Sequence, residues 1–69
     1  MINTIGFNLK KYRLLKNLSQ MKLAEAADLH FTYISQIERG LRKNLSVLKL
    51  KQITDTLGVT LDDIVCKNT

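Results

Sequence analysis

The chain has 69 residues, of which 45% are hydrophobic and 25% charged, with a formal net charge of +5. We expect residues 1–69 to form one domain, whose thin core leaves little room for a pocket, a lid or a second site. Cys66 is the only cysteine, which excludes a disulfide within the chain, and no apolar run approaches the roughly 18 residues of a membrane span. The N-terminus lacks a signal-peptide profile, so we expect a cytoplasmic protein without a membrane partner.

Caps and left-handed turn residues mark the first two expected helices. Apolar residues spaced by four and three positions predict a helix from Thr4 to about Lys16. Asn17 suits the left-handed backbone that terminates a helix. Ser19 is a good N-cap for a second helix over residues 20–27, which places its leucine and alanines on one face.

The third and fourth expected helices each end at a glycine. Residues 31–39 follow a break of three residues and are closed by Gly40. Ser46 is the expected N-cap of residues 47–57, where an apolar stripe runs up to Gly58.

A short last helix is expected over residues 61–66. Thr60 followed three residues later by Asp63 resembles a capping box at its start. The isolated β-branched residues of the chain do not alternate as they would in a strand. The sequence therefore predicts an all-α fold of five short helices.

Residues 20–39 have the spacing of a helix-turn-helix motif. Two short helices that cross steeply need a small residue at their contact, a residue that tolerates left-handed backbone in the turn, and apolar anchors on the second helix. Ala24 provides the small residue and Asp28 the turn residue. Ile34 and Ile37 provide the anchors.

Several segments together resemble the phage-repressor and Cro type (XRE-like) of helix-turn-helix family over about residues 5–65. The segments are LKKYR, LSQMKLAEAA, TYISQIERG, NLS and LGVTLDDI. The resemblance implies a compact five-helix, lambda-repressor-like DNA-binding domain that uses no cofactor, metal or small-molecule ligand. The chain departs from the family pattern in three places: Asp28 replaces the usual glycine, Leu45 replaces a proline, and the loop after Gly40 looks one residue longer.

The third helix carries the candidate base-reading residues. Because Ile34 and Ile37 are expected to point inward, the opposite face can present short polar side chains that hydrogen-bond to base edges. An ordinary solvated surface is the alternative interpretation of this face, and the complete motif favours DNA reading. Phe31 at the tip of the helix is expected to touch a thymine methyl group or a sugar. The candidate set is Phe31, Thr32, Ser35, Gln36 and Arg39.

Phosphate contacts are expected from helix N-termini and basic loops, which hold a domain on the duplex without reading its sequence. The resemblance implies that Gln20 reaches the backbone of the DNA, and the hydroxyl of Tyr33 is expected to do the same. The longer loop leaves the placement of Arg42 and Lys43 open. The candidate phosphate set is Ser19, Gln20, Tyr33, Arg42, Lys43, Asn44 and Ser46.

Glu38 is an acid on a helix that is expected to face DNA. The resemblance implies that it pairs with Arg13 of the first helix, which makes the two residues a partly buried structural ion pair. His30 is expected to cap the third helix or to contact a phosphate. One histidine and one cysteine are too few for a structural zinc set, and no catalytic constellation is present, so we expect no enzyme.

The charge of the chain is uneven. Residues 1–51 contain ten of the eleven lysines and arginines, whereas residues 52–69 contain three of the six acids and one lysine. A basic field of this kind attracts polyanions such as nucleic acid. A basic protein without such a partner is the alternative that charge alone leaves open.

The less basic C-terminal end is the expected surface for a homodimer, since a monomer of this size reads only a few base pairs. The alternative is that its apolar residues only close the monomer. The candidate interface residues are Leu57, Val59, Leu61, Ile64 and Val65.

Within the resembled family, the short chain and its TYISQIERG segment favour the controller protein of a restriction-modification system, regulating its own operon. A Cro-like phage repressor and an antitoxin that neutralises a protein partner are the alternatives. The expected partners are double-stranded DNA with a palindromic operator and a second copy of the chain, with RNA polymerase as a further candidate.

Overall fold

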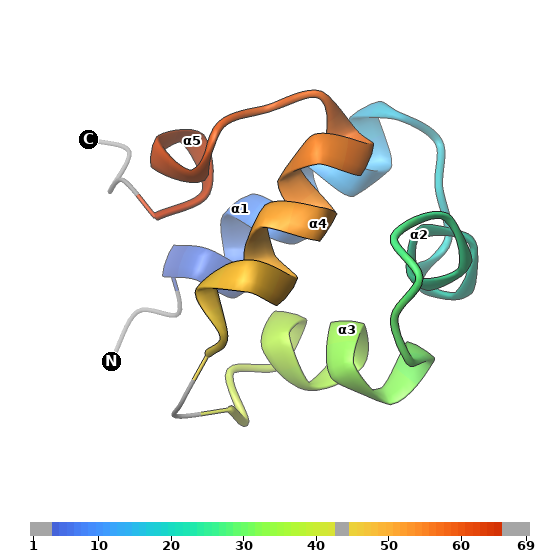
Figure 1. Cartoon of the computed structure of the whole chain (residues 1–69), viewed down its shortest axis with the longest axis horizontal. Helices are drawn as coiled ribbons and strands as arrows, with labels where there is room; N and C mark the ends of the chain where they lie inside the picture. Colours follow the sequence, from blue (N-terminus) through green and yellow to red (C-terminus); the bar gives the residue numbers. More distant parts are fainter. Residues whose placement is uncertain (1–3, 43–44, 66–69) are drawn as a thin grey trace.

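The computed structural model describes residues 4–42 and 45–65, which fold into five α-helices and contain no strand (Figure 1). This confirms the all-α prediction. The helices are α1 (Thr4–Leu15), α2 (Gln20–Ala26), α3 (Phe31–Glu38), α4 (Val47–Leu57) and α5 (Leu61–Val65). The first three end one residue before the predicted positions, because Lys16, Ala27 and Arg39 lie in the turns that close them.

Side-chain caps define the starts of three helices. The hydroxyl of Ser19 accepts a hydrogen bond from the amide of Lys22 at 3.0 Å, and Ser46 accepts one from the amide of Lys49 at 3.3 Å. At α5 the capping box is reciprocal. The amide of Thr60 donates to the carboxylate of Asp63 at 3.0 Å, and the amide of Asp63 donates to the hydroxyl of Thr60 at 3.1 Å. Each cap satisfies an amide that has no partner within its helix.

Among residues 4–42 and 45–65, four turn residues take left-handed backbone. Gly40 and Gly58 have φ angles of 72° and 73°, as expected of residues that close a helix. Asn17 and Asp28 take φ angles of 57° and 59°, in the region where a side chain is sterically strained. The turn between α2 and α3 therefore stores strain at Asp28.

Replacing Asp28 with glycine is expected to raise the free energy of unfolding by about 0.5–1 kcal/mol, because glycine adopts this backbone without a Cβ clash. Thermal unfolding followed by circular dichroism measures the change. Ala26→Gly is the matched control. Ala26 is helical, and glycine there is expected to lower stability by a similar amount. A loss of stability in Asp28→Gly would show that the aspartate side chain stabilises the turn by more than the left-handed backbone at this position costs.

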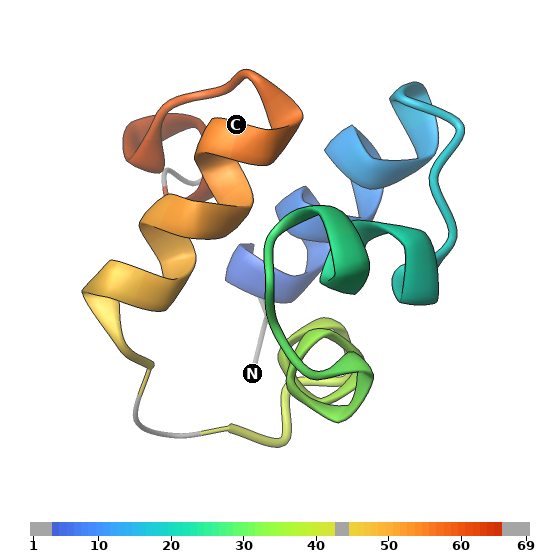
Figure 2. The ribbon, with the colours of Figure 1, turned by 45° about the vertical axis from the view of Figure 1, so that its right-hand side comes forward.

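The core gathers side chains from all five helices. α2 packs on α3, α1 packs on α3 and α5, and α4 packs on α2 and α5. Figure 2 shows α3 nearly end-on beneath α2, the steep crossing predicted for the helix-turn-helix. Ala24, the small residue predicted for the contact between the two helices, is buried on α2. The fully buried apolar side chains are Leu9, Leu23, Ile34, Ile53, Leu57 and Ile64.

A buried hydrogen bond joins the first and the last helix. The side-chain amide of Asn8 on α1 donates to the carbonyl of Ile64 on α5 at 2.8 Å. This bond satisfies a polar group inside the core. It also fixes α5 on the side of the domain opposite α3, so the two helices present separate surfaces (Figure 1).

Candidate nucleic-acid interface

α3 lies along one edge of the domain and is anchored by its buried face. Tyr33, Ile34 and Ile37 are buried. On the other side of the helix, Thr32 and Arg39 are exposed. Ser35 and Gln36 are half-buried, at the border between the core and the solvent-facing side. The helix thus presents a polar strip in which two residues are exposed and two are half-buried.

The N-terminal tip of α3 projects an apolar side chain into solvent. Phe31 is the first residue of the helix and is 42% exposed. His30 is the N-cap residue, but its side chain makes no capping hydrogen bond. The expectation that His30 caps the helix locally was therefore wrong. An aromatic ring that is not fully buried at a helix tip is available for contact with a ligand.

A buried cluster joins α1, α2 and α3. Nε of Arg13 donates to Oε2 of Glu38 at 2.6 Å, and Nη2 donates to Oε1 at 3.0 Å, so the pair is bidentate. The two side chains are 8% and 3% exposed. Nη1 of Arg13 also donates to the carbonyl of Leu18 at 2.7 Å, and the side-chain amide of Gln20 donates to Oε1 of Glu38 at 3.0 Å. Glu38 therefore lies away from solvent, where its charge is balanced.

The side chain of Gln20 has donors for both Glu38 and a phosphate. It begins α2, next to the exposed cap Ser19, and one of its two side-chain N–H donors is used by Glu38. The second donor remains for a phosphate oxygen. The hydroxyl of Ser19 accepts the capping bond from Lys22, and its own proton can still be donated to an anion.

Further candidate phosphate residues converge on Tyr33. Its hydroxyl accepts a hydrogen bond from the amide of Ser46 at 3.4 Å, and the guanidinium of Arg42 lies 4.4 Å from the centroid of its ring. These contacts place the loop and the start of α4 beside α3. Lys43 and Asn44, which belong to the same predicted set, lie outside the described residues.

The apolar residues predicted for a dimer interface divide into two groups. Leu57 and Ile64 are 0% and 1% exposed, so they belong to the core of one protomer. Val59 and Leu61 are partly buried against that core, and Val65 is 44% exposed. The prediction that Leu57 and Ile64 offer surface to a partner is corrected: they hold α4 and α5 in place, because α5 must bury one face to be stable.

A sequence model of the helix-turn-helix family, described as "Helix-turn-helix", matches residues 9–64. The chain belongs to this family. The match covers the whole of the motif described above. The predicted family is thus confirmed.

Similar proteins of known role include restriction-modification controllers. The chain is 48% identical over 61 residues to control protein C.BamHI of Bacillus amyloliquefaciens, covering 87% of this chain and 74% of that protein. It is 43% identical over 60 residues to control protein C.MunI of a Mycoplasma species, covering 86% and 80%. The crystal structure of the controller protein C.Esp1396I superposes with a TM-score of 0.78 at 41% identity, covering 86% of this chain and 75% of the other.

This helix-turn-helix protein is a DNA-binding regulator, similar to restriction-modification controllers, and not an enzyme. Its five helices have the lambda-repressor-like arrangement expected from the sequence. In residues 4–42 and 45–65, no helix combines the length and the apolar character needed to cross a bilayer.

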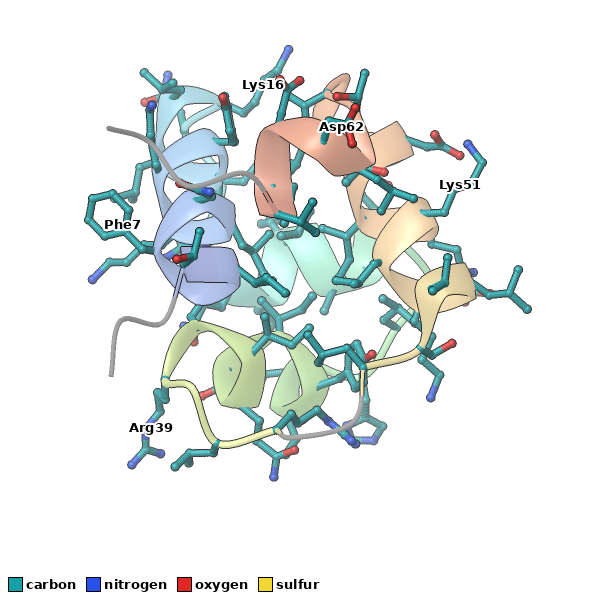
Figure 3. All side chains as sticks on the ribbon, turned by 90° about the vertical axis from the view of Figure 1, so that its left-hand side faces the viewer. Phe7, Lys16, Arg39, Lys51 and Asp62 are labelled. Carbon is teal, nitrogen blue, oxygen red and sulfur yellow. The ribbon has the colours of Figure 1, made fainter. Side chains whose placement is uncertain are left out.

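The arrangement of charge agrees with binding at the α3 side of the helix-turn-helix protein. Figure 3 shows Arg39 at the α3 end of the domain, and Asp62 and Lys16 at the opposite end. The acidic first turn of α5, with Asp62 and Asp63, is therefore remote from α3. Lys16 does not lie beside Arg39.

One cation near α3 was missed by sequence reasoning. Nζ of Lys49 on α4 lies 4.9 Å from the ring centroid of Tyr33. The available signal was its position three residues after the cap Ser46, in the first turn of α4. Sequence alone did not show that this turn faces α3, because spacing within one helix does not tell how two helices pack on each other.

Proposed function

We propose that the chain binds a palindromic operator as a homodimer in the cytoplasm and regulates its own operon, as a restriction-modification controller. The observation that carries this proposal is the polar strip of α3, presented with an exposed Phe31 at its tip by a complete helix-turn-helix. Glutamine, arginine, serine and threonine side chains on such a helix can hydrogen-bond to base edges in the major groove.

The assembly of a similar protein supports an oligomer on DNA. C.Esp1396I has been crystallised as a tetramer in complex with its natural 35 base-pair operator, and that chain superposes on this one with a TM-score of 0.77 at 41% identity. By this similarity we infer operator binding by a two-fold dimer of the present chain, with half-sites about 34 Å apart along the duplex. RNA polymerase is the further partner that activation by such a dimer would involve.

Selection of bound sequences from a random duplex pool tests the proposal. We expect enrichment of a palindrome whose two halves are about one helical turn apart or a multiple of it. The palindrome should occur upstream of the gene that encodes the chain. Absence of enrichment, together with binding that disappears in moderate salt, would show an unspecific polyanion contact instead.

The proposed dimer interface is the C-terminal side of the domain. Val65 is the exposed member of the candidate set, with Val59 and Leu61 beside the core. An isologous contact of this kind places the same apolar patch on both protomers. Because Leu57 and Ile64 are buried inside the protomer, they cannot be used to test dimerisation without unfolding the domain.

Replacing Val65 with aspartate is expected to convert the dimer to a folded monomer, since two like charges would meet at the two-fold axis. Sedimentation velocity measures the mass, and circular dichroism checks the fold. Leu15→Asp is the matched control, because Leu15 is an exposed apolar residue at the end of α1. If the Val65→Asp variant sediments as the wild type does, Val65 is not part of the dimer interface.

A further inference from the structure

Tyr33 is surrounded by groups from three segments. It lies on α3, and its hydroxyl accepts the amide hydrogen of Ser46, the N-cap of α4. The guanidinium of Arg42 from the loop and the ammonium of Lys49 from α4 lie 4.4 Å and 4.9 Å from the centroid of its ring. Both cations are thus brought to one aromatic ring next to the proposed reading face.

The two cations are not balanced by a nearby acid. Within the described parts of the chain, neither Arg42 nor Lys49 forms an ion pair with a carboxylate. Other cations do: Arg13 pairs with Glu38, and Lys51 pairs with Asp55. The attraction of each cation to the aromatic face opposes the repulsion between two like charges held at one ring.

We propose that Lys49 contacts a DNA phosphate, and that Tyr33 is a positioning residue whose ring holds Lys49 and Arg42 ready for that contact. The inference rests on the proposed function. This role differs from the phosphate contact expected of the Tyr33 hydroxyl, because it depends on the aromatic ring. It also adds Lys49, a residue of α4, to the surface that approaches DNA.

A phosphate group is the ligand that fits this arrangement. It is a compact anion that offers several acceptor oxygens, so one phosphate or two neighbouring ones can accept from both cations. Lysine and arginine side chains are flexible, and binding through them normally requires ordering of their rotamers. The ring of Tyr33 limits this freedom before DNA arrives. The contact fixes the position of α3 on the duplex and carries no sequence information.

The first test replaces Lys49 with glutamine and measures DNA affinity by fluorescence anisotropy over a series of salt concentrations. The probes are a mixed-sequence duplex and, where selection provides it, the operator. Loss of one phosphate contact makes the slope of log affinity against log salt shallower by about 0.9 per protomer, and lowers affinity by about eightfold per protomer at 0.1 M salt. Both duplexes should show the same loss, since phosphates are common to both.

Lys51→Gln is the matched control. It removes one charge from the same helix, at a side chain that is 62% exposed and pairs with Asp55. We expect its slope to stay close to that of the wild type. If Lys49→Gln leaves the slope at the wild-type value, or has no more effect than Lys51→Gln, Lys49 is not a phosphate contact. The mixed-sequence duplex gives this answer even if no operator is enriched, so failure of the two proposals can be told apart.

The second test concerns the ring of Tyr33. Tyr33→Phe retains the ring and should retain the full effect of Lys49→Gln, whereas in a Tyr33→Leu background that effect should fall to below about twofold. Equal effects of Lys49→Gln in all backgrounds would contradict a positioning role. Because Tyr33 is buried, circular dichroism first checks that the leucine variant is folded. Independently of any variant, the side-chain protons of Lys49 in the free protein should show an upfield ring-current shift, and ordinary lysine shifts would overturn the proposal.

Discussion

Replacing Glu38 with glutamine is expected to lower the free energy of unfolding by about 3 kcal/mol, since the charge of Arg13 would remain buried without its partner. For a domain of this size that loss corresponds to a fall of about 15 °C in the midpoint of thermal unfolding. The effect should be large because Glu38 accepts from both Arg13 and Gln20, and so connects the first three helices.

The exposed ion pair of α4 is the control for this prediction. Lys51 and Asp55 are 3.3 Å apart with side chains 62% and 65% exposed, and removing either should change stability by less than about 0.5 kcal/mol. Chemical denaturation of Glu38→Gln and Lys51→Ala compares their free energies of unfolding. Similar stabilities for Glu38→Gln and Lys51→Ala would mean that the buried pair contributes no more than a surface pair.

Replacing Gln36 with alanine is expected to abolish most of the preference for the operator. A bidentate contact between glutamine and adenine contributes about 1–3 kcal/mol of discrimination. A dimer on a palindrome loses two such contacts, so affinity for the operator should fall by about thirtyfold or more. Affinity for a scrambled duplex should change little, because Gln36 is not among the residues expected to bind phosphates.

Gln52→Ala is the matched control for this loss, since Gln52 is an exposed glutamine on α4. It should bind both duplexes as the wild type does. Fluorescence anisotropy on the operator and the scrambled duplex measures the ratio of the two affinities for each variant. An equal loss on both duplexes would place Gln36 among the general DNA contacts and leave base reading to other residues of α3.

Local signals predicted the helices and turns well, because their causes lie within a few residues. The caps Ser19 and Ser46 bond to amides three residues away, and Asn17 and Asp28 take the left-handed backbone that their short polar side chains tolerate. The spacing of Ala24 and the two isoleucines of the third helix also predicted the helix-turn-helix crossing. Each of these features depends on sequence distance alone.

The surfaces between helices were predicted less well. The sequence identified the apolar side of the last helix, but periodicity does not tell which residues face the same protomer and which face a partner. The structure places Ile64 in the core and leaves Val65 partly exposed, because α5 packs on both α1 and α4. Which face of a helix is buried depends on neighbouring helices that are distant in the sequence.

The sequence by itself determined five helices, a helix-turn-helix and a polar strip on its second helix, since these follow from caps, spacing and the 3.6-residue period. The pairing of Arg13 with Glu38 across 25 positions was expected only from the family resemblance, and the structure shows it. Only the tertiary structure decided that the cations of the loop and α4 lie over Tyr33. The physical reason is that packing of the apolar faces fixes how helices lie against one another, and the polar groups at their borders then take partners by proximity.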